Sequence, residues 1–479
     1  MLQPLTIDRD SGVAHYRQLS EQIIQQIKQG YLISGARLPS SRNLSKELGI
    51  HRKSVVHAYE ALQLQDWVFT AKGRGTFVAD DLPDLKAQAL AAEQGASTPL
   101  PLSFQVRNFL HATNDDYGYR FHLDDGLPDP RLIPLLELER AQKTALRRGN
   151  LYRKLGYSTP QGSPALREAL ADYLAQSRGL RVSPEEVLVT RGVTNALFLC
   201  LQALLKPGDK VILPEINWSN GDSCFRYHGA HILRAKVDEK GVSIDHVAEL
   251  LKEHPDVRMM YITPHHQYPT TLIMPAGRRI QLLELARQYG VFLFEDDYDF
   301  DFHYGQVPIL PLASTQHGGL VAYAGSFTKA VSPAFRLGYL VGDRKLIAHL
   351  SEIRRVLDRM GDPLLEMSIL ELLRLGTLQR SLRRARLVYQ KRRDYLGGLL
   401  TENFGDRINF RLPDGGMAIW TNFDDDIDLV AVAKRARILG LGISDGSQYG
   451  ENWNATRLGF ASSTEEELEE AVRLLVRSV

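Results

Sequence analysis

The sequence predicts an α/β protein in which a small helical N-terminal unit precedes a larger unit built on a mostly parallel sheet. A chain of 479 residues is long enough for more than one domain. Residues 1–80 carry short helical patterns with basic residues, whereas from about residue 113 to residue 479 apolar, strand-like runs alternate with longer helical patterns. Between them, residues 81–112 are rich in Ala, Gln, Pro and Ser, which predicts a linker. The alternative is that the last of these residues form a loop of the second unit.

Composition limits the classes of function. The chain is 44% hydrophobic and 24% charged, and its net charge is +1, so contact with nucleic acid requires a local basic patch. The two cysteines, Cys200 and Cys224, cannot hold a fold of this length together, which favours a reducing, cytoplasmic compartment. We find no signal pattern at the N-terminus and no apolar run of membrane-spanning length, so no membrane partner is expected.

The first 80 residues predict three helices and a hairpin. A helix over Tyr16 to Gln29 has one apolar face. A short helix, Arg42 to Leu48, follows two serines, with Ser41 as its expected N-cap. Gly49-Ile50 forms a turn before a third helix, from about Arg52 to Leu64. Two strand-like runs, Trp67 to Thr70 and Thr76 to Val78, then flank Lys72-Gly73-Arg74-Gly75.

Two helices joined by a glycine turn, with basic residues at the start of the second, predict a helix-turn-helix, and the basic hairpin predicts its wing. The start of the second helix of such a unit meets base edges in the major groove, and the wing reaches phosphates or the minor groove. Any one of these cations alone is more often solvated surface. Their ordered combination predicts binding to double-stranded DNA through Ser40, Arg42, His51, Arg52, Lys53, Ser54 and Arg74.

This segment resembles the winged helix-turn-helix of the GntR superfamily of transcription regulators. The resemblance covers nearly all of the first 80 residues. It rests on Leu38-Pro39-Ser40-Ser41-Arg42, Leu44, Leu48-Gly49, Ser54-Val55, Ala58-Tyr59, Leu62 and Gly73-Arg74-Gly75-Thr76-Phe77-Val78.

In the second unit, near-continuous apolar runs separated by helices predict a parallel sheet covered on both faces. Ligands of such sheets bind at the carboxyl ends of the strands, and both Lys329 and Glu295-Asp296-Asp297 come just after an expected strand. The last hundred residues, from about 380, predict a smaller α/β unit with a long basic helix (Leu382 to Leu400), a hairpin around Pro413-Asp414-Gly415-Gly416 and a closing helix. The expected strands of the sheet are Val187 to Thr190, Val211 to Leu213, Met259 to Ile262, Val291 to Phe294 and Val321 to Ala324.

Lys329 is the most informative residue of this unit. It ends the small-residue run Ser326-Phe327-Thr328-Lys329, and Arg336 follows closely. An amine and a guanidinium after a strand are what pyridoxal phosphate requires, namely a Schiff base to its aldehyde and donors for its phosphate. For Ser-x-x-Lys alone, a surface lysine in a loop is the commoner interpretation, so the assignment needs support from other residues.

Three further groups supply that support. Asp296 can pair with the pyridine nitrogen of such a cofactor, and Tyr298 can donate to its ring hydroxyl, although an acidic loop can also bind Mg²⁺ or be merely solvated. The backbone N–H groups of Val193 and Thr194, after Gly192, can bind a phosphate. Trp218 can stack on the ring, and a core tryptophan is the alternative. No metal site is predicted.

In this order the features resemble the fold-type I aminotransferases of class I and II, from roughly Tyr117 to the C-terminus. The resemblance implies that Lys329 forms the Schiff base, that Asp296 pairs with the pyridine nitrogen and that Tyr298 pairs with the ring hydroxyl. It further implies that Ser326 and Arg336 bind the phosphate, that Tyr157 reaches it from a partner subunit of a homodimer, and that Arg457 receives the carboxylate of an amino-acid-like ligand. The motifs are Tyr157 to Gly162 with Leu166-Arg167, Gly192-Val193-Thr194, Pro264 to Pro269, Glu295 to Tyr298, Ser326 to Lys329, and Arg457 to Phe460.

A GntR-type head joined to an aminotransferase-like body resembles the MocR subfamily of GntR regulators. The runs Thr263 to Pro269 and Glu295 to Asp299 are closer to those regulators than to free aminotransferases. The resemblance implies a transcription regulator in which a small amino compound, or pyridoxal phosphate itself, binds the body and alters promoter binding. The alternative is an active aminotransferase that carries a DNA-binding appendage.

Three departures from the aminotransferase pattern bear on this choice. Tyr268 stands where free aminotransferases usually carry an asparagine that supports the ring hydroxyl, which implies weakened turnover. Trp218 stands where a tyrosine is common, and Asn220 stands where some relatives have an arginine that helps to hold the effector. We therefore expect a sensor rather than a catalyst, with an effector whose anionic groups differ from those of these relatives.

Overall fold

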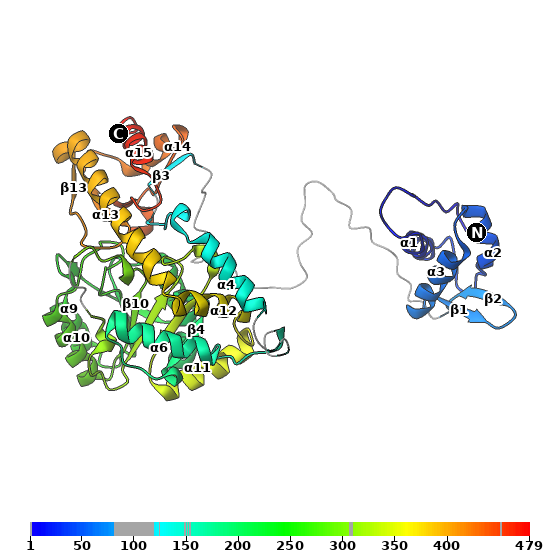
Figure 1. Ribbon diagram of the computed structural model, residues 1–479, viewed down its shortest axis with the longest axis horizontal. Helices are drawn as coiled ribbons and strands as arrows, with labels where there is room; N and C mark the ends of the chain where they lie inside the picture. The colour runs from blue at the N-terminus through cyan, green and yellow to red at the C-terminus, as the bar shows by residue number, and fades with distance from the viewer. Residues whose placement is uncertain are drawn as a thin grey trace. The chain divides into compact units, whose positions relative to one another are not determined.

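The structure is a computed structural model that describes residues 2–80, 119–123, 125–147, 150, 152, 155–305, 310–450 and 453–479 (Figure 1). The chain divides into two compact units, residues 1–105 and 106–479. The predicted linker, residues 81–112, lies outside the described residues, so its boundaries stay a prediction. Within the described ranges, every helix is too short or too polar to cross a bilayer.

The N-terminal unit has the predicted three helices and hairpin. Leu19 and Ile23 of the first helix, Leu44 of the second and Val55 and Leu62 of the third form a buried core. The two strands pair antiparallel, from Val68↔Val78 to Ala71↔Gly75. The elements are α1 (His15–Lys28), α2 (Ser41–Leu48), α3 (Arg52–Leu64), β1 (Val68–Ala71) and β2 (Gly75–Val78).

The expected cap of α2 is wrong by one residue. Ser40, not Ser41, is the N-cap, because its hydroxyl accepts a hydrogen bond from the amide of Asn43 at 3.2 Å. The hydroxyl of Ser41, inside the helix, accepts instead from Nε of Arg52 at 3.3 Å. Gly49 ends α2 with φ +60°, a left-handed conformation that glycine adopts without strain.

The C-terminal unit is built on a seven-stranded sheet in the order β4-β12-β11-β10-β9-β5-β6. All neighbours are parallel except β12, which runs antiparallel to both β11 and β4. The predicted, mostly parallel sheet is therefore confirmed. Its strands are β4 (Val187–Thr190), β5 (Lys210–Pro214), β6 (His231–Ala235), β9 (Met259–Ile262), β10 (Phe292–Asp297), β11 (Val321–Ser326) and β12 (Gly338–Val341).

Helices cover both faces of this sheet (Figure 1). Alternate residues of β4 belong to different cores: Leu188 packs with α7 and α11, whereas Val187 and Val189 pack with α6 and α12. A third core places α9 and α10 against Ile212 and Leu293. The helices are α4 (Leu135–Arg147), α6 (Pro164–Arg178), α7 (Val193–Leu204), α8 (Ser219–Tyr227), α9 (Ile244–Glu253), α10 (Ala276–Tyr289), α11 (Arg344–Leu357) and α12 (Pro363–Arg374).

One expected strand end is wrong. The run Glu295-Asp296-Asp297 does not follow the strand but forms the last three residues of β10, paired with Tyr323, Ala324 and Gly325 of β11. Acidic residues are rare inside buried strands, so their sequence signal favoured a loop. Hydrogen bonds from backbone amides stabilise the buried carboxyl of Glu295, which accepts from Leu312 at 2.8 Å and from Ala313 at 3.0 Å.

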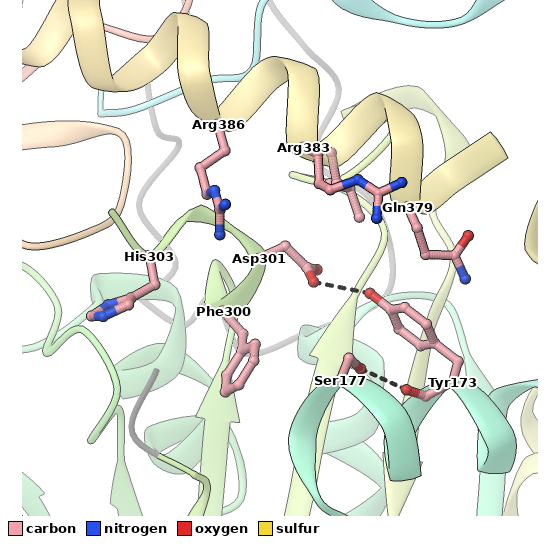
Figure 2. Close-up of a pocket in the computed structure, with 9 residues that line it drawn as sticks. Tyr173, Ser177, Phe300, Asp301, His303, Gln379, Arg383 and Arg386 are labelled. Carbon is pink, nitrogen blue, oxygen red and sulfur yellow. Dashed lines mark hydrogen bonds between the residues drawn. The ribbon is translucent and has the colours of Figure 1, made fainter. Parts of the chain in front are cut away.

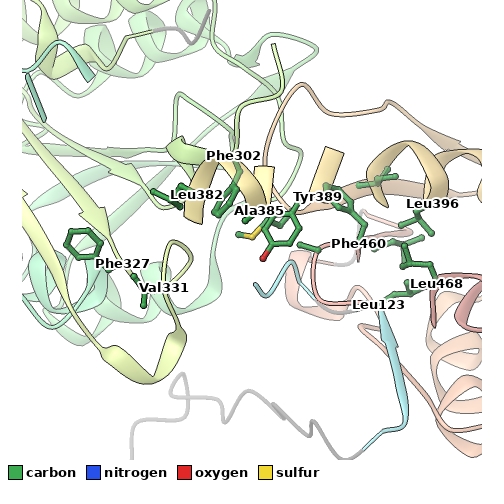
Figure 3. Close-up of a cluster of buried hydrophobic side chains, with 14 of the residues drawn as sticks. Leu123, Phe302, Phe327, Val331, Leu382, Ala385, Tyr389, Leu396, Phe460 and Leu468 are labelled. Carbon is green, nitrogen blue, oxygen red and sulfur yellow. The ribbon is translucent and has the colours of Figure 1, made fainter. Parts of the chain in front are cut away.

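The last part of the chain forms a smaller α/β layer around the long helix α13 (Thr377–Phe404). The predicted hairpin is confirmed as β13 (Ile408–Phe410) and β14 (Ala418–Phe423), and β14 also pairs with β16 (Ala455–Gly459). The predicted closing helix is α15 (Glu465–Val476). Figure 3 shows side chains of α13 from Leu382 to Leu396 within one apolar core that also contains Phe327 and Phe460.

A strand that the sequence did not reveal completes this layer. The segment β3 (Phe121–Leu123) pairs in parallel with β15 (Leu441–Ile443), which follows α14 (Leu429–Ile438). Residues near the start of the C-terminal unit thus pack against residues near its end. This brings the segment after β3 toward β16 and the carboxyl edge of the large sheet.

Candidate functional site

Asp296, near the end of β10, is a buried carboxylate with one unused oxygen. Its Oδ2 accepts a hydrogen bond from the hydroxyl of Tyr261 at 2.6 Å, whereas its buried Oδ1 has no hydrogen-bond partner among the described residues. Burial raises the pKa of Asp296 to about 7, and the hydrogen bond from Tyr261 acts in the opposite direction. A buried carboxylate with one unpartnered oxygen suits a cationic N–H partner, and a protonated pyridine nitrogen is such a group.

Three donors converge on one point between β4, β11 and β12. Gly192 is the N-cap of α7 and has φ +89°. A Cβ atom at this position would lie 3.6 Å from Nη2 of Arg336 and 3.9 Å from Oγ of Ser326. A helix N-terminus, a guanidinium and a hydroxyl that face the same small space form a cradle for a phosphate. Val193 and Thr194 are the first residues of α7, as the sequence predicted.

Lys329 follows β11 and is half-buried. Its Nζ donates a hydrogen bond to the carbonyl of Gly126 at 2.6 Å. Tyr298 follows β10, and its hydroxyl donates to the carbonyl of His266 at 3.1 Å. Trp218, the N-cap of α8, and Tyr298 both pack against the apolar cluster that contains Tyr268 and Tyr449. The structure therefore gives both aromatic residues a place at the same cluster.

Arg457, in β16, is the buried cation of the site. Its side chain is 2% exposed, and its Nη1 donates to the carbonyl of Pro269 at 3.0 Å. Its guanidinium lies 4.9 Å from the centre of the Tyr268 ring. Its Nε lies 2.5 Å from Oδ1 of Asp125, a residue that the sequence argument missed. The only signal for Asp125 was its place beside Gly126 in a turn-like run before Pro128.

Tyr268, at the position where free aminotransferases usually carry an asparagine, contacts Asp125. Its hydroxyl donates a hydrogen bond to Oδ2 of Asp125 at 2.8 Å and lies 3.5 Å from the hydroxyl of Tyr449. Burial raises the pKa of Tyr268 well above the usual value, so the phenol stays a neutral donor. Tyr268 thus supports Asp125 and Arg457.

Two other residues lie apart from this group. Tyr157 is 77% exposed, and its ring is 4.2 Å from the guanidinium carbon of Arg359. Within this one chain its contacts are those of a surface residue, so its predicted role toward a partner subunit stays a prediction. Asn220 is exposed on α8.

Three buried histidines, His265, His266 and His303, lie behind Tyr298. One ring nitrogen of each histidine lies within 4.8 Å of those of the other two. Gly415 also packs against Nε2 of His266, since a Cβ at this glycine would lie 2.1 Å from that atom. The ring of His266 bonds to Asp299 through Nδ1 at 2.7 Å. Both ring nitrogens of His265 and Nε2 of His266 are buried without a hydrogen-bond partner among the described residues. The backbone carbonyl of His266 accepts the hydrogen bond from Tyr298.

A cavity of about 200 Å³ lies elsewhere, between α6 and α13 (Figure 2). Tyr173 and Asp301 on its wall share a hydrogen bond of 2.9 Å, and Asp301 also pairs with Arg178. None of the residues that line it is among the predicted cofactor residues. His303 of the histidine cluster is one of the residues that line this cavity.

The N-terminal unit presents the predicted cations to solvent. Ser40, Arg42, His51, Arg52, Lys53 and Arg74 are exposed and Ser54 is half-buried. His51 caps α3, with its Nδ1 accepting from the amide of Lys53 at 3.2 Å. None of these cations forms an ion pair with another described residue of the unit. The start of α3 thus combines exposed side-chain charge with the positive end of the helix dipole, which suits a phosphate backbone.

Asp296 gives a prediction that needs no ligand. Because its pKa in the folded protein lies above that of the unfolded chain, the folded state holds a proton that the unfolded chain releases between about pH 4 and 7. The stability of the cofactor-free protein should fall as pH rises through this window, by roughly 4 kcal/mol at most. Asp296→Asn should remove the part of that fall that comes from Asp296 and should also weaken cofactor binding. Burial also raises the pKa of Glu295 and Asp297, so a smaller fall should remain in the variant.

Urea unfolding of both cofactor-free proteins at pH 5 and pH 8 measures this effect. Asp414→Asn, at an exposed carboxylate of the same unit, is the matched control and should keep the pH dependence of the parent chain. An equal loss of stability between the two pH values in Asp296→Asn and in the parent would contradict the assignment.

Comparison with known proteins agrees with both units. Residues 15–78 match the family of bacterial regulatory proteins of the GntR type, and residues 134–475 match the family of class I and II aminotransferases. Among solved structures, an archaeal alanine:glyoxylate aminotransferase is 28% identical with a TM-score of 0.71, covering 74% of this chain and 90% of that one. The α-aminoadipate aminotransferase LysN of Thermus thermophilus is 28% identical with a TM-score of 0.69, covering 76% and 92%.

Two relatives that match this chain over both units carry the names of regulatory proteins. The probable rhizopine catabolism regulatory protein MocR of Rhizobium meliloti is 27% identical over 92% of this chain and 88% of its own length. The pyridoxine biosynthesis regulator PdxR of Corynebacterium glutamicum is 29% identical over 97% and 96%. This chain belongs to the class I and II aminotransferase family and carries a GntR-family DNA-binding domain at its N-terminus, the architecture of the MocR subfamily of regulators.

Proposed function

We propose that this chain is a transcription regulator that binds promoter DNA through its N-terminal unit and pyridoxal phosphate through its C-terminal unit. In this proposal a small amino compound, or pyridoxal phosphate itself, binds the C-terminal unit and modulates promoter binding. The observation that carries it is the presence in one chain of an exposed, basic start of α3 and of a buried site with Asp296, Lys329 and the cradle at Gly192. A regulator of promoters acts where the DNA is, in the cytoplasm.

Each residue has a proposed part in holding the cofactor. When bound, the cofactor supplies an aldehyde that reacts with amines and a ring that withdraws electrons. Lys329 provides the amine that holds the aldehyde, and Asp296 keeps a proton at the ring nitrogen. Ser326, Arg336 and the amides of Val193 and Thr194 bind the phosphate. Tyr298 donates toward the ring hydroxyl, and Trp218 covers one face of the ring.

We further propose that the C-terminal unit forms a homodimer. The exposed Tyr157 is then available to reach the phosphate of the partner subunit, as the aminotransferase pattern implies. Two N-terminal units would face two half-sites of one operator. A ligand changes DNA affinity only if it binds one conformation better than the other, so effector binding and promoter binding must be reciprocal.

The test is a promoter-binding assay with the full-length protein and DNA from upstream of its own gene. We expect DNA affinity to change by about 5- to 150-fold when pyridoxal phosphate or an added amino compound is present. Turnover is measured in parallel with an amino donor and a keto acid. Sustained multiple turnovers without any effect on DNA affinity would favour the enzyme instead.

The name of PdxR favours the form of this proposal in which pyridoxal phosphate itself is the effector. In that case the cofactor alone changes DNA affinity, and amino compounds add nothing. Under this reading Lys329→Ala would weaken the response to pyridoxal phosphate. A response that requires an amino compound would exclude it.

A further inference from the structure

Asp125 pairs with the residue that is proposed to receive the carboxylate of a ligand. Its Oδ1 lies 2.5 Å from Nε of Arg457, and its Oδ2 accepts from the hydroxyl of Tyr268 at 2.8 Å. The side chain of Arg457 is 2% exposed and that of Asp125 is 45% exposed. The buried partner is therefore fixed, whereas the carboxylate that neutralises it can be reached from solvent.

Gly126, the residue after Asp125, contacts Lys329, the other residue that is proposed to meet a ligand. The carbonyl of Gly126 accepts a hydrogen bond from Nζ of Lys329 at 2.6 Å. An amino acid carries an amine for the position of Lys329 and a carboxylate for Arg457. Asp125 and Gly126 together contact both of these recognition points from one short segment of the chain.

The charge of Arg457 requires a partner. A buried guanidinium without a counter-charge is strongly unfavourable. Burial alone would lower the pKa of Arg457, but the negative charge of Asp125 raises it, so the guanidinium stays charged. A ligand carboxylate can take this place only if Asp125 leaves it.

The segment around Asp125 lies between two fixed points. On one side β3 pairs with β15. On the other side Oδ2 of Asp129 pairs with Nη1 of Arg392 at 2.8 Å, and the amide of Asp129 donates to the hydroxyl of Tyr389 at 2.9 Å. In the sequence, β3 comes soon after the residues that join the two units.

We propose that Asp125 competes with the carboxylate of a ligand for Arg457. Asp125 thereby determines how strongly the site distinguishes amines that carry a carboxylate from amines that do not. An amine with a carboxylate binds Arg457 by displacing Asp125, whereas an amine without one leaves the Asp125–Arg457 pair in place. The inference rests on the proposed function, because it assigns the amine and carboxylate positions to Lys329 and Arg457.

The first test titrates the cofactor-loaded, full-length protein and follows the absorbance of the cofactor. The probes are four amino acids (glycine, L-alanine, L-glutamate and β-alanine) and ethylamine, which is L-alanine without its carboxylate. Asp125→Asn should bind at least one amino acid roughly tenfold more tightly than the parent chain, with ethylamine unchanged. Asp125→Glu, which keeps the charge, and Asp414→Asn, which removes an exposed Asp–Arg pair, should behave like the parent.

Unchanged affinity for all four amino acids in Asp125→Asn would overturn the proposal. An equal gain for ethylamine would also overturn it, because the effect would then not depend on the carboxylate of the ligand.

The second test uses cofactor-free protein, so it does not depend on the proposed function. Asp125→Ala should lower the melting temperature, and sodium acetate should restore it by several degrees more than sodium chloride at equal ionic strength, since acetate can replace the missing carboxylate. The parent chain should show no such preference for acetate. Equal effects of the two salts on Asp125→Ala would overturn the proposal, whereas a parent chain that binds no cofactor would contradict only the proposed function.

Discussion

Lys329→Ala is expected to abolish the visible absorbance band of bound pyridoxal phosphate while the protein stays folded. The band arises from the Schiff base to the lysine amine, and an alanine cannot form it. Lys329 is half-buried, so its loss removes little packing. Absorbance spectra and a thermal melt of both proteins measure the two parts of this expectation.

A reduction experiment identifies the lysine directly. Borohydride followed by peptide mass spectrometry should place the cofactor on the peptide of Lys329 in the parent chain and on no peptide of the variant. Lys345→Ala is the matched control, because Lys345 is an exposed lysine at the start of α11 in the same unit. Retention of the visible band in Lys329→Ala would refute the cofactor assignment.

Arg52→Ala should weaken operator binding by about 5- to 150-fold without changing cofactor binding. Arg52 is the first residue of α3, and its Nε donates to the hydroxyl of Ser41, which directs the side chain along the start of the helix. A good contact to a base edge is worth about 1–3 kcal/mol, which gives this range. Fluorescence anisotropy with operator DNA measures it.

Salt dependence separates the two kinds of DNA contact. Arg74→Ala, in the turn of the β1–β2 hairpin, should reduce the slope of log affinity against log salt by about 0.9, because a phosphate contact is lost. Arg17→Ala removes the same charge at an exposed arginine of α1 that is not among the predicted DNA contacts, and it should have little effect. Equal losses in Arg52→Ala and Arg17→Ala would remove Arg52 from the interface.

Local signals predicted much of the fold. The bounds of α3 agree with the prediction at both ends, because polar residues mark its start and the apolar pattern ends with Leu64. The parallel sheet followed from apolar runs that are buried on both faces. Local signals failed where a tertiary contact outweighed them. The acidic end of β10 is held by partners from other segments, and Ser40 and Ser41 carry the same side chain, so only geometry decides which one caps α2.

For the candidate site, too, some features follow from local sequence signals and others depend on tertiary contacts. The motifs in the sequence predicted the chemical groups of the two units, namely a lysine, a carboxylate, candidate phosphate donors and the cations of α3, because each belongs to a short run with a recognisable spacing. The sequence does not reveal which of these groups face one another, because that depends on how distant segments pack. The tertiary structure leaves Oδ1 of Asp296 unpartnered among the described residues, brings the hydroxyl of Tyr268 to Asp125 and places Asp125 on Arg457. These pairings join residues far apart in the chain, and no local pattern encodes a contact that depends on how β3, β15 and β16 pack.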